Sequence, residues 1–148
     1  MAETADILTN DDQNVILPNM TAGCSMADMA ITDDVLDCWD DLGAVLKNKI
    51  VTPITYMNST ADIKSLCGEN DGVVCTSSNA EQTFEWALKK QGKILFLPDQ
   101  HLGRNTAYRM GISDDEMIVW DPFKSLGGNS EEDINKSKII LWLSLIHI

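Results

Sequence analysis

Polar side chains suited to binding a small anion follow a β-rich run of this sequence. The run Lys49–Tyr56 is a predicted strand, Asn58 and Ser59 follow it, and the helix-like segment Ala61–Leu66 begins directly afterwards. In open α/β sheets, ligands collect beyond the carboxyl ends of strands, where helix N-termini present free N–H groups. The pattern therefore predicts an anion-binding turn. The competing interpretation is a hydroxyl-rich helix cap that binds no ligand.

A second strand and turn repeat this arrangement further along the chain. The apolar run Gly72–Thr76 is a predicted strand that leads into Ser77, Ser78 and Asn79, and Ala80–Lys90 is a predicted helix. If the two strands are parallel neighbours, both turns lie at one edge of the sheet. Two adjacent polar helix starts favour a shared anion site. The residue types alone do not identify the anion.

The remaining segments alternate between strand and helix patterns. Further strands are predicted over Asn14–Leu17, Lys93–Leu97, Glu116–Trp120 and Lys138–Trp142. Further helices are predicted up to Leu8, from a Thr32 cap through Leu46, over His101–Met110 and from Ser130. Such alternation predicts an α/β fold with a parallel sheet and helices on both faces. Because Pro53 lacks a backbone N–H, its strand is predicted to lie at an edge or to contain a bulge.

Composition argues against several classes of partner. The 148 residues carry a formal net charge of −12. This charge argues against nucleic acid or an anionic membrane surface as a partner, because a protein needs a basic face to bind either of them. No apolar run approaches the roughly 20 residues of a membrane-spanning helix. The start of the chain lacks the charged-then-apolar pattern of a secretory signal, so we expect a cytoplasmic protein.

The four cysteines lack the spacing of a metal or redox motif. None of Cys24, Cys38, Cys67 and Cys75 belongs to a CxxC pair, which disfavours a zinc site and a redox-active dithiol. Disulfides are not expected in a reduced cytoplasm. Considered by themselves, these side chains are predicted to be small buried hydrophobic groups.

Five motifs narrow these general expectations. They are Asp6-Ile7-Leu8 with Val15–Pro18, Ala22–Asp28, Tyr56–Thr60, Cys75–Asn79, and Phe96–Asp99 with Leu102–Arg104. In order and spacing they resemble the quinolinate synthase family, and the resemblance runs from Met1 to about Trp142. Each motif alone is weakly specific, whereas five of them in the same order are strongly specific.

The resemblance implies an activity, two substrates and a cofactor. Members of this family are transferases that condense iminoaspartate with dihydroxyacetone phosphate, forming C–C and C–N bonds with dehydration. The product, quinolinate, feeds pyridine nucleotide (NAD) biosynthesis. The family uses a [4Fe-4S] cluster held by three cysteines, whose open iron acts as a Lewis acid. L-Aspartate oxidase is an implied supplier of iminoaspartate, and no nucleic acid or membrane partner is implied.

The resemblance also implies roles for particular residues. Cys24 matches a ligand of the cluster. Tyr56, Met57 and Asn58 match the lining of the substrate pocket, with Tyr56 as a catalytic hydrogen-bond donor or proton carrier. Ser77 matches a serine that binds a substrate carboxylate.

Finally, the resemblance implies that the chain is a fragment, inactive when alone. Residues 1–26 correspond to the C-terminal part of a first domain, and residues 27–142 to a central three-layer αβα domain, one of three similar domains. Residues 143–148 depart from the family pattern, so we interpret them as a non-native tail and do not equate His147 with the family's histidine. The alternative hypothesis is a non-catalytic α/β module that binds a small anionic metabolite.

Overall fold

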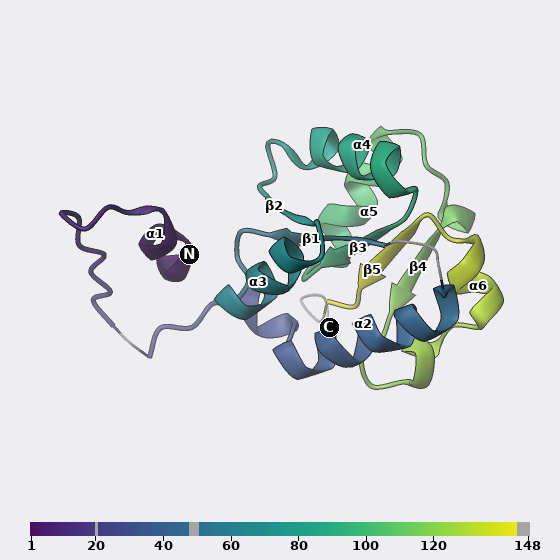
Figure 1. Cartoon of the computed structure of the whole chain (residues 1–148), viewed down its shortest axis with the longest axis horizontal. Coiled ribbons are helices and arrows are strands. Elements are labelled where there is room, and N and C mark those ends of the chain that lie inside the picture. The colour runs from purple at the N-terminus through teal and green to yellow at the C-terminus, as the bar shows by residue number, and fades with distance from the viewer. Residues whose placement is uncertain (20, 48–50, 145–148) are drawn as a thin grey trace.

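A parallel sheet of five strands lies at the centre of the fold (Figure 1). The structure is a computed structural model and describes residues 1–19, 21–47 and 51–144. In sheet order the strands are β2 (Val73–Cys75), β1 (Thr52–Tyr56), β3 (Ile94–Leu97), β5 (Ile139–Trp142) and β4 (Met117–Trp120). Every neighbouring pair is parallel, so all the strands end at the same edge of the sheet. The predicted α/β fold with a parallel sheet is confirmed.

Helices cover both faces of this sheet. One face packs against α2 (Thr32–Leu46), α3 (Ala61–Glu69) and α6 (Glu131–Lys136). The other packs against α4 (Ala80–Gln91) and α5 (Gln100–Arg109), which lie above the sheet in Figure 1. The short helices η1, η2 and η3 span Ala27–Met29, Asp114–Glu116 and Ser125–Gly128. Helix α1 (Ala2–Leu8) lies outside these layers (Figure 1).

The two helix layers explain why β3 and β5 are apolar at every position. Leu95 and Leu97 of β3 belong to the core beneath α2, α3 and α6, whereas Ile94 and Phe96 belong to the core beneath α4 and α5. Strands of a parallel sheet that are buried on both faces typically have such continuous apolar runs. Each fully buried side chain of this kind contributes about 1.5–3 kcal/mol to stability. The sheet is therefore a rigid platform for the turns at its carboxyl edge.

Pro53 lies inside the sheet, so the predicted edge strand is wrong. Strand β1 pairs with β2 on one side and with β3 on the other. The Thr52 N–H donates to Lys93 O, so the next nitrogen, that of Pro53, faces the β2 side, where pairing begins only at Ile54. The missing N–H therefore removes no ladder bond. Gly72 lies so close to Pro53 that a Cβ on this glycine would come within 2.0 Å of Pro53 O.

Two local predictions in the N-terminal part are also wrong. The residues Asn14–Leu17 lie outside any helix or strand, and Ile16 is 82% exposed, because no strand among the described residues pairs with them. Thr32 is the first residue of α2 rather than its cap, and Ile31 at the cap position makes no side-chain capping bond. Helix α2 is instead held by its buried apolar side, which includes Val35 and Leu42.

Part of two sequence-based predictions falls outside the described residues. These are the start of the strand predicted from Lys49 and the residues 145–148 of the predicted tail, His147 included. The first two tail residues are described: the Leu143 N–H donates to Trp120 O, and the Ser144 hydroxyl donates to Asp99. Within the described ranges, no helix is both long and apolar enough to cross a membrane.

Candidate active site

The two predicted anion-binding turns lie side by side at the carboxyl edge of the sheet. Tyr56, the last residue of β1, is in register with Cys75, the last residue of β2. The Met57 N–H donates to Cys75 O at 2.9 Å, which joins the strand ends directly. We call residues 57–60 the first turn and residues 76–79 the second turn. The prediction that β1 and β2 are parallel neighbours is confirmed, whereas a ligand shared by their turns stays a prediction.

The first turn is capped where it enters α3. Thr60 is the N-cap residue of α3, and its hydroxyl oxygen accepts a hydrogen bond from the Ile63 N–H. The Lys64 ammonium donates to Ser59 O at 2.5 Å. The helix cap that the competing interpretation of this sequence requires is therefore present, at Thr60. It satisfies part of the positive helix end without any ligand.

Two side-chain atoms of the first turn are buried without a partner. These are Asn58 Oδ1 and the hydroxyl oxygen of Ser59, whose residue is only 2% exposed. Buried polar atoms are nearly always hydrogen-bonded, and leaving one unpaired costs about 1–3 kcal/mol. Thr52 Oγ1 is also unpaired, but Thr52 begins β1 and lies at the opposite edge. At the carboxyl edge, the first turn thus offers two atoms that a ligand could satisfy.

The second turn is hydrogen-bonded mainly within itself. Asn79 Oδ1 accepts from the Thr76 N–H at 2.7 Å and from the Thr76 hydroxyl at 3.0 Å. The hydroxyls of Thr76 and Ser78 lie 2.9 Å apart. Asn79 occupies the N-cap position of α4 but makes no side-chain capping bond, because its amide oxygen points back to Thr76. Ser77 is exposed on this turn, beside a helix start that has no side-chain cap.

Cys24 differs from the other cysteines in its surroundings. Its thiol is free and half-buried, and it lies in the segment before η1, far along the chain from both turns. Cys38, Cys67 and Cys75 are buried, as the sequence predicts, whereas the same prediction is wrong for Cys24. Burial raises the pKa of Cys38 and raises the pKa of Cys67 and of Cys75 to about 12. These three thiols therefore stay protonated and are poor metal ligands at neutral pH.

The described residues do not by themselves fit an iron–sulfur cluster. Across residues 1–19, 21–47 and 51–144, no three His, Cys, Asp or Glu side chains are grouped so that they could hold a metal ion. Cys24 would need thiolates supplied from elsewhere, because a [4Fe-4S] cluster is held by several thiolates. Its predicted role as a cluster ligand stays a prediction.

Asp99 lies at the same edge of the sheet, and no role is predicted for it from the sequence. It follows β3 and is only 8% exposed. Its carboxylate accepts from the backbone N–H groups of His101 and Leu102, at 3.0 and 3.1 Å, and so caps α5. The signal was present, because an aspartate after a strand and before a helix is a typical N-cap. Asp99 is therefore occupied in capping.

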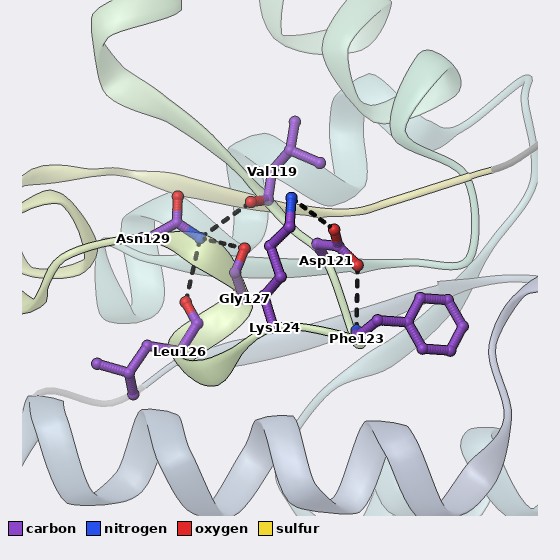
Figure 2. Close-up of polar contacts among 7 residues, drawn as sticks. All are labelled: Val119, Asp121, Phe123, Lys124, Leu126, Gly127 and Asn129. Carbon is purple, nitrogen blue, oxygen red and sulfur yellow. Dashed lines mark hydrogen bonds and ion pairs between the residues drawn. The ribbon is translucent and has the colours of Figure 1, made fainter.

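The loop after β4 lies at the end of the sheet opposite β2, and Figure 2 shows its polar contacts. The Asn129 side-chain amide donates to three backbone carbonyls, those of Val119, Leu126 and Gly127. Gly127 has a φ of +64°, and a Cβ on it would come within 2.5 Å of the Trp120 ring. Glycine is therefore required here by both backbone conformation and space.

The same loop is closed by a charged pair. The Asp121 carboxylate accepts from the Phe123 N–H at 3.1 Å and lies 3.0 Å from the Lys124 ammonium (Figure 2). These contacts, with that of Lys124 first, lower the pKa of Asp121. Phe123 projects outward and is 78% exposed. The loop is internally bonded, and Figure 1 shows it at the end of the sheet away from β2 and the two turns.

Comparison with known proteins decides the family. Residues 1–147 match the family model described as "Quinolinate synthetase A protein". The chain belongs to the quinolinate synthetase A family. It is 54% identical over 142 residues to the quinolinate synthase of Corynebacterium glutamicum and 59% identical over 143 residues to that of Acidobacterium capsulatum. The resemblance identified from the five motifs is therefore confirmed.

The matches cover most of this chain but a minor part of each relative. They include 96% of the chain, but only 36% of the Corynebacterium protein and 38% of the Acidobacterium protein. A third quinolinate synthase, from Nocardioides, is 57% identical and is covered to 38%. No solved structure matches the chain significantly. The chain thus spans somewhat over a third of the length of these family members.

Proposed function

We propose that this chain is part of an enzyme that condenses iminoaspartate with dihydroxyacetone phosphate to form quinolinate for NAD biosynthesis. The observation that carries the proposal is the first turn, where Asn58 Oδ1 and the Ser59 hydroxyl are buried without a partner beside the second turn. Membership of the quinolinate synthetase A family supports the same activity. The 148-residue chain alone is inactive, because it spans only part of such an enzyme.

The two turns would together bind one carboxylate of iminoaspartate. Ser77 would donate its exposed hydroxyl from the start of α4, whose first N–H groups have no side-chain cap. Asn58 would donate to the same carboxylate through its side-chain N–H, and its buried Oδ1, which can only accept, would be satisfied by a substrate N–H. Met57 would line the pocket between Tyr56 and Asn58. Hydrogen bonds to a charged group contribute about 1.5–3 kcal/mol each, enough to orient a small dianion.

Tyr56 would be the catalytic residue of this segment. It ends β1 and is half-buried, so its phenol lies at the strand end from which the first turn begins. A phenol at this point donates a hydrogen bond to the bound substrate or carries a proton during the condensation. General acid–base catalysis of this kind contributes typically 10²- to 10⁴-fold to a rate, by the usual magnitudes.

The whole enzyme would contain a [4Fe-4S] cluster, which supplies Lewis-acid chemistry for dehydration when bound. Cys24 is the ligand that this chain would contribute. In the same proposal, residues 1–26 end a first domain, and residues 27–142 form a central αβα domain. L-Aspartate oxidase would supply the iminoaspartate.

The proposal is tested in a hybrid enzyme, in which residues 1–142 replace the matching segment of the full-length quinolinate synthase of Corynebacterium glutamicum. We expect quinolinate to form from iminoaspartate and dihydroxyacetone phosphate. Tyr56→Phe should lower kcat by roughly 10²-fold, because the phenol proton is lost. Tyr108→Phe is the matched control, since Tyr108 is exposed on α5 and its hydroxyl donates to Asp114.

Two outcomes would contradict the proposal. A folded hybrid that binds iminoaspartate but makes no quinolinate would favour the alternative, a non-catalytic module that binds a small anionic metabolite. An unchanged kcat for Tyr56→Phe would reduce Tyr56 to a packing residue, even if the hybrid is active.

A further inference from the structure

Helix α1 contacts the first turn through two polar side chains. Glu3 Oε2 accepts a hydrogen bond from the Ala61 N–H at 2.9 Å, across a separation of 58 residues. The Thr4 hydroxyl donates to Met57 O at 3.2 Å. Helix α1 buries none of its residues, and its Leu8 is 77% exposed. Its position beside the turn is therefore not due to a shared apolar core.

These two contacts act on the backbone at both ends of the first turn. The Met57 N–H is bonded to Cys75 O and its carbonyl to Thr4, while the Ala61 N–H is bonded to Glu3. Between these points lie Asn58 and Ser59, whose side-chain oxygens have no partner. The backbone around the two residues is thus fixed from outside, while their side-chain oxygens stay available.

The charge of Glu3 reinforces this arrangement. A carboxylate at the first N–H of a helix interacts favourably with the positive helix end. Glu3 also acts on Lys64, whose ammonium donates to Ser59 O. Partial burial lowers the pKa of Lys64, and the negative charge of Glu3 opposes this shift. Glu3 therefore supports the turn both directly, at Ala61, and through the charged form of Lys64.

We propose that Glu3 and Thr4 are positioning residues of the candidate site. By fixing the backbone from Met57 to Ala61, they hold the Ser59 hydroxyl and the Asn58 side-chain N–H where these can donate to the substrate carboxylate, with Asn58 Oδ1 placed to accept from a substrate N–H. The inference rests on the proposed function for the identity of the ligand. It adds that a helix from the start of the chain is required for tight substrate binding, although it contains no group that touches the substrate.

The contact itself is tested in the 148-residue chain by amide hydrogen exchange at Ala61, followed by NMR. Glu3→Ala should speed this exchange by about 10- to 100-fold, since a hydrogen bond to a charged group is lost. Glu3→Gln keeps an acceptor oxygen and should restore most of the protection. Asp6→Ala removes another exposed carboxylate of α1 and serves as control. Unchanged exchange in Glu3→Ala would overturn the proposal.

The positioning role is tested in the hybrid enzyme, with iminoaspartate formed from oxaloacetate and ammonia. Glu3→Ala and Thr4→Val should each raise KM for iminoaspartate by about 10-fold. Each variant loses one hydrogen bond to the backbone of the turn, that of Glu3 with the Ala61 N–H or that of Thr4 with Met57 O. KM for dihydroxyacetone phosphate should not change, whereas a merely structural role would alter both constants or neither. Glu3→Gln should recover most of the affinity, and Asp6→Ala should match the parent.

The two proposals fail in different ways. If the parent hybrid makes no quinolinate, the proposed function fails, and the exchange of the Ala61 amide still decides whether Glu3 holds the turn. If the parent hybrid is active and Glu3→Ala leaves KM for iminoaspartate unchanged, the positioning role is wrong and the proposed function stands.

Discussion

The first and second turns have similar compositions but opposite hydrogen-bonding arrangements. The first is bonded from outside, by Glu3, Thr4 and Lys64, and it leaves two buried side-chain oxygens unpaired. The second is bonded within itself, between Thr76 and Asn79, and it leaves the start of α4 without a side-chain cap. Two polar turns before helices therefore need not offer a ligand the same groups.

This difference assigns complementary roles to the two turns. At the first turn, Thr60 and Glu3 already accept from N–H groups at the start of α3, so what it offers is the side chains of Asn58 and Ser59. At the second turn, the open helix end and the exposed Ser77 hydroxyl are the available donors. A carboxylate bound between them would receive donors from α4 and contacts from the first turn.

The largest expected effect comes from disturbing the approach of β2 to β1, the two strands that carry the turns. Gly72→Ala should lower the free energy of unfolding by about 3 kcal/mol, the upper end of overpacking costs, because the new Cβ meets the backbone oxygen of Pro53. Urea unfolding of the 148-residue chain measures this. Gly68→Ala is the control, since nothing lies within 4 Å of its Cβ position and it should gain about 0.5–1 kcal/mol of stability in α3. Equal effects at the two glycines would show that β2 does not need this close approach.

A smaller effect is expected at the second turn, on binding alone. In the hybrid enzyme, Ser77→Ala should weaken iminoaspartate binding by roughly 10- to 100-fold, because one hydrogen bond to a carboxylate is lost. Its melting temperature should stay that of the parent, since Ser77 is exposed and lies outside the network of Thr76 and Asn79. The opposite pattern, a lower melting temperature with unchanged KM, would mean that Ser77 is structural.

The smallest effect is expected at the first turn, on stability alone. Thr60→Ala removes the cap of α3 and should lower the free energy of unfolding by about 1 kcal/mol. Thr60→Ser keeps the capping hydroxyl and is the matched control. KM for iminoaspartate should change little, because Glu3 still bonds to the Ala61 N–H. If Thr60→Ala weakened iminoaspartate binding as much as Ser77→Ala, the separation of binding at the second turn from stability at Thr60 would be wrong.

The fold was more predictable than the details of the site. The alternation of strands and helices, the adjacent turns and the burial of three cysteines follow from local apolar patterns, and the structure agrees with them. The strand at Asn14–Leu17 failed because an apolar run becomes a strand only beside a partner. Pro53 was misplaced because β2 begins only opposite Ile54, and where β2 begins is not encoded near the proline.

The sequence by itself determined the order of the elements, the family and the positions of Tyr56, Asn58 and Ser77 at strand ends. Those properties depend on residues close together in the chain, through periodicity, turn residues and motif spacing. Only the tertiary structure decided which donors and acceptors are left over. Asn58 Oδ1 is buried without a partner. Glu3 reaches Ala61 because segments 58 residues apart pack at one edge of the sheet. Such long-range contacts have no local signal, since a hydrogen bond depends on where the chain brings its two atoms.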